Sequence, residues 1–139
     1  PRRDVLLDTG PLVACLDARD QWHRACVVVW PDLLARCVTT EAVLTEATHL
    51  LGRGAGRAAL PLEFLLEARI PVVPLDPAAH RQAALLMRRY ARVPMDYADA
   101  TLVVVGDALD AEVVFTTDRR GFAAYRGAGG RPFVVLPEG

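Results

Sequence analysis

The 139-residue sequence predicts an α/β protein, a three-layer sandwich in which helices flank a short, mostly parallel sheet. Two observations predict this class. Short apolar segments alternate with longer segments of helical periodicity along the chain. Helix boundary residues also stand where the periodicity changes, such as Thr40 and Asp76 before a helix and Gly52 after one. Because no repeat, linker or low-complexity segment interrupts this pattern, we expect one domain over residues 1–139.

The first half of the chain is expected to contribute two strands and four helices. The strands are predicted at 5–7, which ends at Asp8, and at 37–39. Proline is tolerated in the first turn of a helix, so Gly10-Pro11 predicts a helix over 12–16. Asp20 is a candidate cap for the next helix, and Thr40 for the one after it. The three further helices are expected at about 21–31, 41–51 and 57–68.

The second half is expected to add three strands and two long helices. Two prolines reduce the segment 70–75 to a strand at a sheet edge, because proline cannot donate to a sheet ladder. Asp76-Pro77 predicts a helix start, and Asp96 or Tyr97 opens another helix. The expected elements are helices at 77–91 and 98–109, strands at 112–116 and 132–136, and loops at 92–95 and 121–130.

The composition excludes several kinds of catalysis. The sequence contains no Ser, no Asn and no Lys, and all 16 of its basic residues are Arg. Serine hydrolases, Ser-His-Asp triads and lysine Schiff bases are therefore excluded. The net charge of −1 does not by itself indicate a nucleic-acid partner. Any phosphate chemistry must then depend on a local site.

The apolar runs and the cysteines bear on the cellular compartment. The longest apolar runs are much shorter than a membrane span, and no signal-peptide pattern opens the chain, so we expect a soluble protein with no membrane partner. Cys15, Cys26 and Cys37 lie in apolar contexts and match neither a disulfide framework nor zinc-site spacing. Three buried free thiols favour the reducing cytoplasm.

Glu46 is the acid that fits its predicted surroundings least well. On a helix over 41–51, apolar residues such as Val43, Ala47 and Leu51 share one face, and Glu46 falls at the edge of that face. A carboxylate beside a core is costly unless it is paired with a positive group or binds a cation. Glu46 is therefore a candidate for a functional role.

Three further acids are predicted to lie near one edge of the sheet. Asp8 and Asp118 follow strands, and Asp99 stands in the first turn of a helix. In parallel α/β sheets, sites form beyond the carboxyl ends of the strands. Clustered carboxylates repel each other unless a cation intervenes, and oxygen ligands select Mg²⁺ or Mn²⁺ over zinc. Such an ion can polarise a phosphoryl oxygen and activate water, which is the chemistry of phosphodiester hydrolysis.

Four segments of the chain resemble the ordered motifs of PIN-domain ribonucleases, and most closely those of the VapC-type toxins of bacterial toxin–antitoxin pairs. These segments are Val5-Leu6-Leu7-Asp8-Thr9, Leu44-Thr45-Glu46, Met95-Asp96-Tyr97-Ala98-Asp99-Ala100 and Phe115-Thr116-Thr117-Asp118-Arg119. The resemblance covers nearly the whole chain, in the family's order and spacing. Each motif is weak alone, and the set is fairly specific.

The resemblance implies a role for each of these residues. Asp8, Glu46, Asp99 and Asp118 would be the catalytic, metal-binding quartet, and Thr116 would match the hydroxyl residue that supports the last acid. It also implies a PIN-like fold and Mg²⁺- or Mn²⁺-dependent cleavage of RNA. A homodimer and inhibition by a small antitoxin protein are further expectations. Asp96 is an additional acid that only some family members have.

Other interpretations of the same residues stay open at this point. Asp8-Thr9-Gly10 also matches the aspartic-protease signature, but those enzymes are all-β and need two such copies. Asp96 and Asp99 have capping-box spacing, which we favour as the role of Asp96 and not of Asp99. Asp118 alone could be a turn residue. A receiver domain also places acids after its first strand, but it needs a Lys that this chain lacks.

Two further expectations concern binding. Arg119 and Arg120 are adjacent to Asp118 and are candidate RNA-binding residues. More distant arginines that could extend a phosphate-binding rim are Arg53, Arg57, Arg88, Arg89 and Arg92. The alternative function is a PIN-like binding module without catalysis, which would bind no metal and tolerate neutralisation of its acids.

Overall fold

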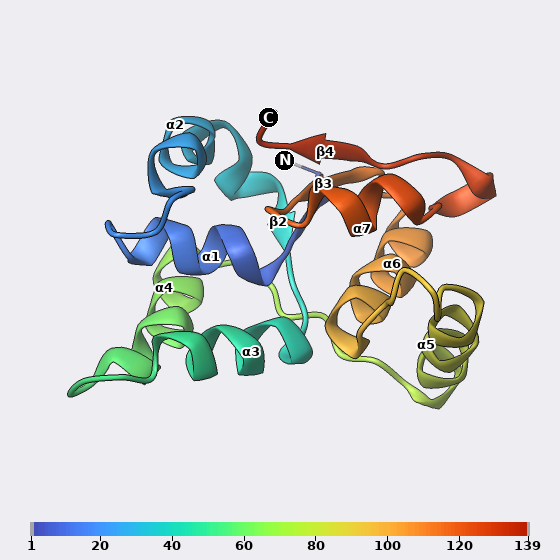
Figure 1. Cartoon of the computed structure of the whole chain (residues 1–139), viewed down its shortest axis with the longest axis horizontal. Coiled ribbons are helices and arrows are strands. Elements are labelled where there is room, and N and C mark those ends of the chain that lie inside the picture. Colours follow the sequence, from blue (N-terminus) through green and yellow to red (C-terminus); the bar gives the residue numbers. More distant parts are fainter. Residues whose placement is uncertain (1, 139) are drawn as a thin grey trace.

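The computed structural model describes residues 2–138, in which four parallel strands form one sheet in the order β2-β1-β3-β4 (Figure 1). In the central pairing, Leu6 lies opposite Val38 on one side and Val114 on the other. Every strand pair is parallel, which confirms the predicted α/β class. The strands are β1 (Val5–Leu7), β2 (Cys37–Val38), β3 (Val113–Phe115) and β4 (Val134–Leu136).

Seven α-helices connect and cover these strands in the part of the chain that the structure describes. Two of them separate β1 from β2, four separate β2 from β3, and one separates β3 from β4. They are α1 (Thr9–Leu16), α2 (His23–Leu33), α3 (Glu41–Leu51), α4 (Leu60–Ala68), α5 (Pro77–Arg89), α6 (Tyr97–Leu109) and α7 (Arg119–Ala124). No helix within residues 2–138 has the length and apolar character that crossing a bilayer requires.

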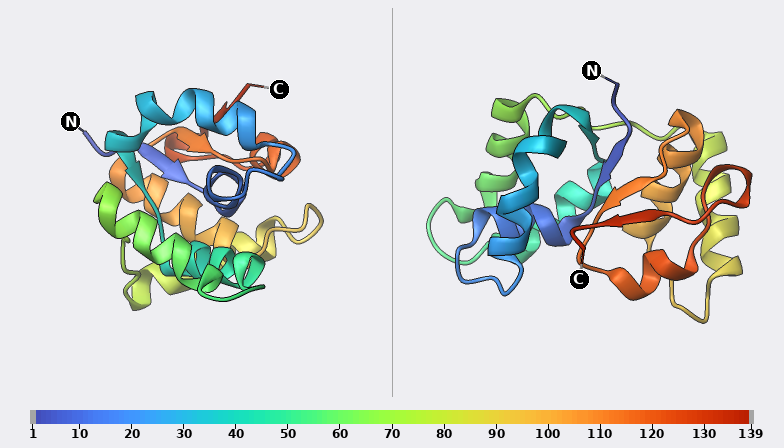
Figure 2. Two further views of the ribbon diagram at one scale, coloured as in Figure 1. Left: turned by 90° about the vertical axis from the view of Figure 1, so that its left-hand side faces the viewer. Right: turned by 90° about the horizontal axis from the view of Figure 1, so that it is seen from above.

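Alternation along the central strand divides the core between two faces of the sheet. Leu6 packs in a cluster with residues of α5 and α6, whereas Val5 and Leu7 pack with residues of α1, α2 and α4. Helices therefore cover the sheet from both sides, as Figure 2 shows. Successive side chains of a strand point to opposite faces, so three apolar residues suffice to anchor both layers. The three-layer sandwich is confirmed.

Side-chain caps fix three helix starts close to the expected positions. Thr40 accepts a hydrogen bond from the backbone N–H of Val43, and Asp76 accepts one from Ala79. Asp96 accepts one from Asp99 at 2.8 Å, and so begins α6 at Tyr97. These bonds satisfy N–H groups that have no partner within their own helix.

Several sequence-based boundaries were wrong. Helix α1 begins at Thr9 and not at residue 12, because Asp8 already serves as its N-cap. Asp20 accepts from Trp22 in a turn before α2 and does not cap that helix. The expected edge strand at 70–75 is reduced to one parallel bridge between Thr39 and Val72.

The segment expected to be a loop after residue 121 contains a helix. Helix α7 occupies Arg119–Ala124 because the Asp118 carboxylate accepts from the N–H of Gly121 and caps its first turn. This helix has only six residues and contains Gly121, so its sequence shows no clear helical periodicity. The correction matters because α7 carries the chain from Asp118 to Tyr125.

Candidate metal centre

Asp8 stands at the carboxyl end of the central strand, where the chain order of the sheet reverses. From β1 the sheet continues to β2 on one side and to β3 on the other. Such a reversal leaves a crevice beyond the strand ends. Asp8 is buried there, and its Oδ1 accepts the backbone N–H of Thr9 at 2.8 Å. The strand end and the first turn of α1 together fix this carboxylate.

Thr116 links Asp8 to the loop that follows the neighbouring strand. Its hydroxyl donates to Asp8 Oδ2 at 2.6 Å and accepts from the backbone N–H of Asp118 at 2.9 Å. A single buried hydroxyl therefore contacts the first acid and positions the backbone of the last. The sequence predicted support for Asp118 only, and the structure adds the bond to Asp8.

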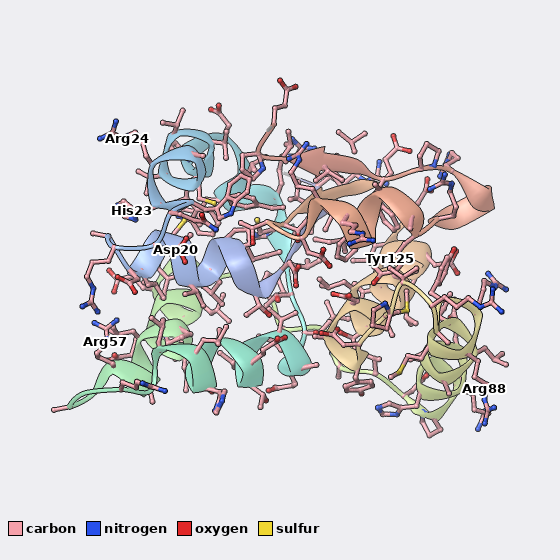
Figure 3. All side chains as sticks on the ribbon, in the orientation of Figure 1. Asp20, His23, Arg24, Arg57, Arg88 and Tyr125 are labelled. Atoms are coloured by element: carbon pink, nitrogen blue, oxygen red, sulfur yellow. The ribbon has the colours of Figure 1, made fainter. Side chains whose placement is uncertain are left out.

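Asp99 reaches the same centre from the first turn of α6. Its carboxylate is buried and accepts a hydrogen bond from the Tyr125 hydroxyl at 2.8 Å. Figure 3 shows Tyr125 between α7 and α6. Gly121 lets the Asp118 carboxylate and the Tyr125 hydroxyl lie close to the backbone of α7. A Cβ at this position would clash with Asp118 Oδ2 and lie 3.1 Å from the Tyr125 hydroxyl. Sequence reasoning missed Tyr125, because it follows a helix that was predicted to be loop.

Glu46 faces the start of α1 from the middle of α3. Its Oε2 accepts a hydrogen bond from the Thr9 hydroxyl at 3.3 Å, and Thr9 also binds Asp8 through its backbone. Glu46 is half-buried, as its predicted place at the edge of the apolar face suggested. In Figure 1, α1 and α3 lie on one side of the centre of the molecule and α6 and α7 on the other. The Thr9 contact of Glu46 and the mutual charge effects of Asp8, Asp99 and Asp118 place the four predicted acids around one region.

The buried acids make the electrostatics of this centre unfavourable. The pKa of Asp8 is raised from 3.8 to about 6, mainly by burial. The charges of Asp118 and Asp96 add to this shift, and the hydrogen bonds from Thr116 and Thr9 oppose it. Burial also raises the pKa of Asp99, and the neighbouring charge of Asp8 adds to this shift. The two carboxylates lie close enough to disfavour each other's ionisation. The centre therefore has an excess of negative charge, and no basic side chain lowers the pKa of Asp8 or Asp99.

This donor set fits a hard divalent cation. Carboxylate oxygens are the ligands that Mg²⁺ and Mn²⁺ prefer, and a cation would remove the repulsion between Asp8 and Asp99. Within residues 2–138, no three His, Cys, Asp or Glu side chains already stand close enough to hold an ion together. The acids thus lie at one edge without forming a ready set of three ligands, and a bound cation would either draw their side chains closer or be shared through water.

Tyr125→Phe tests whether the Asp99 contact matters to this centre. Phenylalanine keeps the edge-to-face packing on Tyr90 and Phe122 but removes the hydrogen bond to Asp99. We expect Mn²⁺ binding, measured by calorimetry, to weaken about 10-fold. Tyr90→Phe is the matched control, because the Tyr90 hydroxyl accepts from the N–H of Arg126 and contacts no acid of the centre. Equal weakening in both variants would contradict a specific role for Tyr125.

The two arginines beside the centre differ in burial and in hydrogen bonding. Arg119 is half-buried and donates to the carbonyl of Pro137, which ties α7 to the end of β4. Arg120 is exposed and is the better candidate to meet a phosphate. Arg57 and Arg88 lie at opposite ends of the molecule in Figure 3, so they do not share one rim around the acids.

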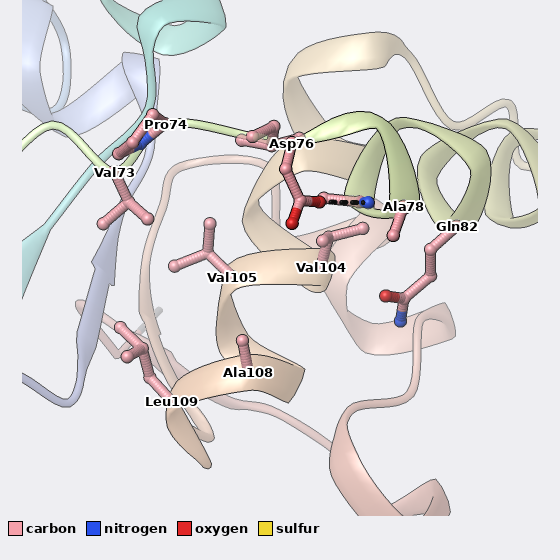
Figure 4. A pocket seen from close by; sticks show the side chains of 11 residues that line it. Val73, Pro74, Asp76, Ala78, Gln82, Val104, Val105, Ala108 and Leu109 are labelled. Atoms are coloured by element: carbon pink, nitrogen blue, oxygen red, sulfur yellow. Dashed lines mark hydrogen bonds between the residues drawn. The ribbon is translucent and has the colours of Figure 1, made fainter.

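A cavity of about 610 Å³ lies apart from these acids, between the start of α5 and one face of α6 (Figure 4). Val104, Val105 and Leu109 form much of its apolar wall. Its acid, Asp76, is engaged in capping α5. This cavity therefore lacks the groups that hydrolytic chemistry needs, and the region bordered by the four acids is the candidate site.

The fold and the site together define a class: an open parallel α/β protein whose acidic side chains gather at the switch in strand order. Comparison with known proteins agrees. The family model described as the PIN domain matches residues 5–128. Ribonuclease VapC26 of Mycobacterium tuberculosis (strain ATCC 25618 / H37Rv) is 30% identical over 138 residues, which cover 96% of this chain and 100% of that protein. The chain belongs to the PIN-domain family.

Solved structures share the fold. The crystal structure of VapC20 from Mycobacterium tuberculosis, a toxin that cleaves the sarcin–ricin loop, aligns with a TM-score of 0.77 at 21% identity, over 87% of this chain and 95% of that one. VapBC2 from Rickettsia felis, bound to a DNA fragment from its promoter, aligns with a TM-score of 0.66 at 12% identity, over 96% and 98%. At these identities the likeness supports the three-layer architecture alone.

Proposed function

We propose that this protein is a Mg²⁺- or Mn²⁺-dependent endoribonuclease that hydrolyses RNA phosphodiester bonds, and that it is the toxin of a VapBC-type toxin–antitoxin system. The observation that carries the proposal is the gathering of Asp8, Asp99 and Asp118 beyond the central strands, with Glu46 one hydroxyl away. Membership of the PIN-domain family and 30% identity to a VapC ribonuclease over nearly the whole chain support it.

The four acids are the proposed ligands and catalytic groups. Asp8, Glu46, Asp99 and Asp118 would hold the divalent ion, which when bound supplies polarisation of a phosphoryl oxygen and acidification of water. Thr116 holds Asp8 through its hydroxyl. Asp96 caps α6 and so fixes the helix turn that carries Asp99.

The protein scaffold contributes the orientation of these acids. Three of the carboxylates belong to residues that cap or open a helix: Asp8 caps α1, Asp118 caps α7 and Asp99 stands in the first turn of α6. Helix N-termini favour negative charge, so these positions suit groups that bind a cation. Arg120 beside Asp118 is the proposed phosphate contact, with Arg119 supporting the helix that carries it.

The proposed partners follow from the same assignment. The substrate is RNA, and a small antitoxin protein would inhibit the toxin by covering the acidic centre. We further propose a homodimer and one PIN-like nuclease domain over residues 1–139. The free thiols of Cys15, Cys26 and Cys37 fit the reducing cytoplasm as the place of action.

A metal titration against a panel of structured RNAs tests the function. Purified protein stripped with a chelator should cut no RNA, and cleavage should return with Mg²⁺ or Mn²⁺ but not with Ca²⁺ at the same concentration, because Mg²⁺ and Ca²⁺ differ in preferred size and geometry. Cleavage products are resolved on sequencing gels. Full cleavage in excess chelator would contradict the metal requirement, and no cleavage with any metal would favour the binding module without catalysis.

A further inference from the structure

Tyr97 is an exposed aromatic side chain beside the acidic centre. It opens α6 directly after Asp96 and two residues before Asp99. Its side chain is 44% exposed, and it is the single Phe, Trp or Tyr within residues 2–138 that is exposed. Nothing in the core or in the proposed hydrolysis requires an aromatic ring at this position.

A second helix places an aromatic side chain beside the Tyr97 ring. The His80 imidazole of α5 stacks on it with ring centroids 6.4 Å apart and an interplanar angle of 17°. An aromatic pair in this arrangement is attractive. The Tyr97 ring therefore has a stacked neighbour on α5, while part of the ring stays exposed to solvent.

Two cavities meet at Tyr97. One, of about 400 Å³, is lined by Tyr97, His80 and Thr101 among others. The other, of about 580 Å³, is lined by Tyr97 together with Glu46 and Asp96, and His80 does not reach it. Tyr97 thus borders a second cavity that His80 leaves uncovered and that shares its wall with the acidic centre.

The lining of this second cavity suits a nucleobase. Ala42 and Ala98 provide small apolar walls, and Thr45 and His49 provide groups that can hydrogen-bond a base edge. Asp96 on the same wall is not one of the proposed metal ligands, and its negative charge disfavours a second phosphate there. A neutral, flat group is therefore favoured in this space, while the phosphate stays at the acids.

We propose that Tyr97, backed by His80, is the stacking surface for an unpaired RNA base adjacent to the phosphate that is cut. This inference rests on the proposed ribonuclease function and adds a base subsite to it. Proteins that read RNA commonly stack splayed-out bases on aromatic rings. The subsite would require the substrate to be single-stranded at the cut, and it would let the enzyme select loops over duplexes.

Steady-state cleavage kinetics of a short RNA that the wild type cuts will test the subsite. Tyr97→Ala should raise KM about 5- to 100-fold, the range that one lost base–aromatic stack produces, and change kcat little. Tyr97→Phe should restore the wild-type KM, because it keeps the ring. Leu85→Ala is the matched control, since Leu85 is exposed on α5 and lines neither cavity.

Abasic substrates identify the base itself. An abasic site at the nucleotide that stacks on Tyr97 should raise the wild-type KM by the same factor and should have no further effect on Tyr97→Ala. The inference is overturned if Tyr97→Ala leaves KM unchanged, or if every abasic effect adds fully to that of Tyr97→Ala. If Tyr97→Ala weakens only antitoxin binding, the surface belongs to a protein partner and the base subsite is wrong. Wild-type protein that neither binds nor cuts RNA would overturn the proposed function as well.

Discussion

Asp8→Asn and Asp99→Asn are each expected to reduce RNA cleavage by more than about 100-fold while the fold stays intact. Each substitution keeps the size of the side chain and removes one negative charge from the centre. Asp8 and Asp99 are buried, and they come from the central strand end and from α6 respectively. Either substitution replaces a charged carboxylate ligand with a neutral amide, which binds a hard divalent ion much more weakly.

The comparison needs an acid of the same type that lies outside the centre. Asp32→Asn provides it, because Asp32 is exposed near the end of α2. Single-turnover cleavage of one RNA, with saturating Mn²⁺ and protein in excess, should show the wild-type rate for Asp32→Asn. Circular dichroism spectra should match for all three variants. If Asp8→Asn or Asp99→Asn cuts RNA at the wild-type rate, the assignment of the centre is wrong.

The metal-free protein is expected to lose stability as the pH rises, because ionisation of the centre is disfavoured in the folded state. The pKa of Asp8 is about 6 in the folded protein against 3.8 when unperturbed, so its protonated form favours folding. This contribution is fully present below about pH 4 and is lost as the pH rises through 6. Asp99, whose pKa is also raised, acts in the same direction. For Asp8 alone the full effect is about 3 kcal/mol.

Neutralising Asp8 should therefore stabilise the metal-free protein. Urea unfolding at pH 8 in a chelator should show Asp8→Asn more stable than the wild type by up to about 3 kcal/mol. The gain should shrink toward pH 5, where Asp8 is mostly protonated in the folded state. Measurements should stay above pH 5, because Asp4 and Asp17 have lowered pKa values and contribute the opposite pH dependence in acid.

Metal should remove most of the stability difference between these two proteins. At pH 8 with Mn²⁺ at about 100 times its dissociation constant, the wild type should gain about 2.7 kcal/mol in free energy of unfolding, and Asp8→Asn should gain much less. If the metal-free stability of the wild type rises from pH 5 to 8, ionisation of Asp8 does not destabilise the fold. If Mn²⁺ stabilises both proteins equally, Asp8 does not bind the ion.

Local chemistry made most of the fold predictable. Thr40, Asp76 and Asp96 were read correctly as helix caps, because capping depends on a side chain and on an N–H group three residues later in the chain. The strands were found because short, continuous apolar runs are typical of strands buried on both faces. The predictions were wrong where local signals conflicted. Apolar residues around Val72 favour a strand that the neighbouring prolines oppose, and the glycine inside α7 favours a loop where a helix forms.

The candidate site was only partly predictable, because its contacts join residues far apart in the chain. Glu46 stood out as an acid beside an apolar face, and Asp8 and Asp118 as acids that follow strands. By contrast, the bond from Thr116 to Asp8 spans 108 residues, and the bond from Tyr125 to Asp99 spans 26. No periodicity or spacing specifies such a pair.

The sequence by itself determined the parallel α/β class and most of the helices and strands, and it supplied the acids that we propose for the centre. These features depend on apolar period, capping chemistry and residue type, which a chain carries locally. Tertiary structure alone decided that Tyr125 binds Asp99, that Arg119 is held by Pro137 and that the Tyr97 ring is backed by His80. Each of these depends on how two packed elements place their side chains in space, and packing is a property of the whole folded chain.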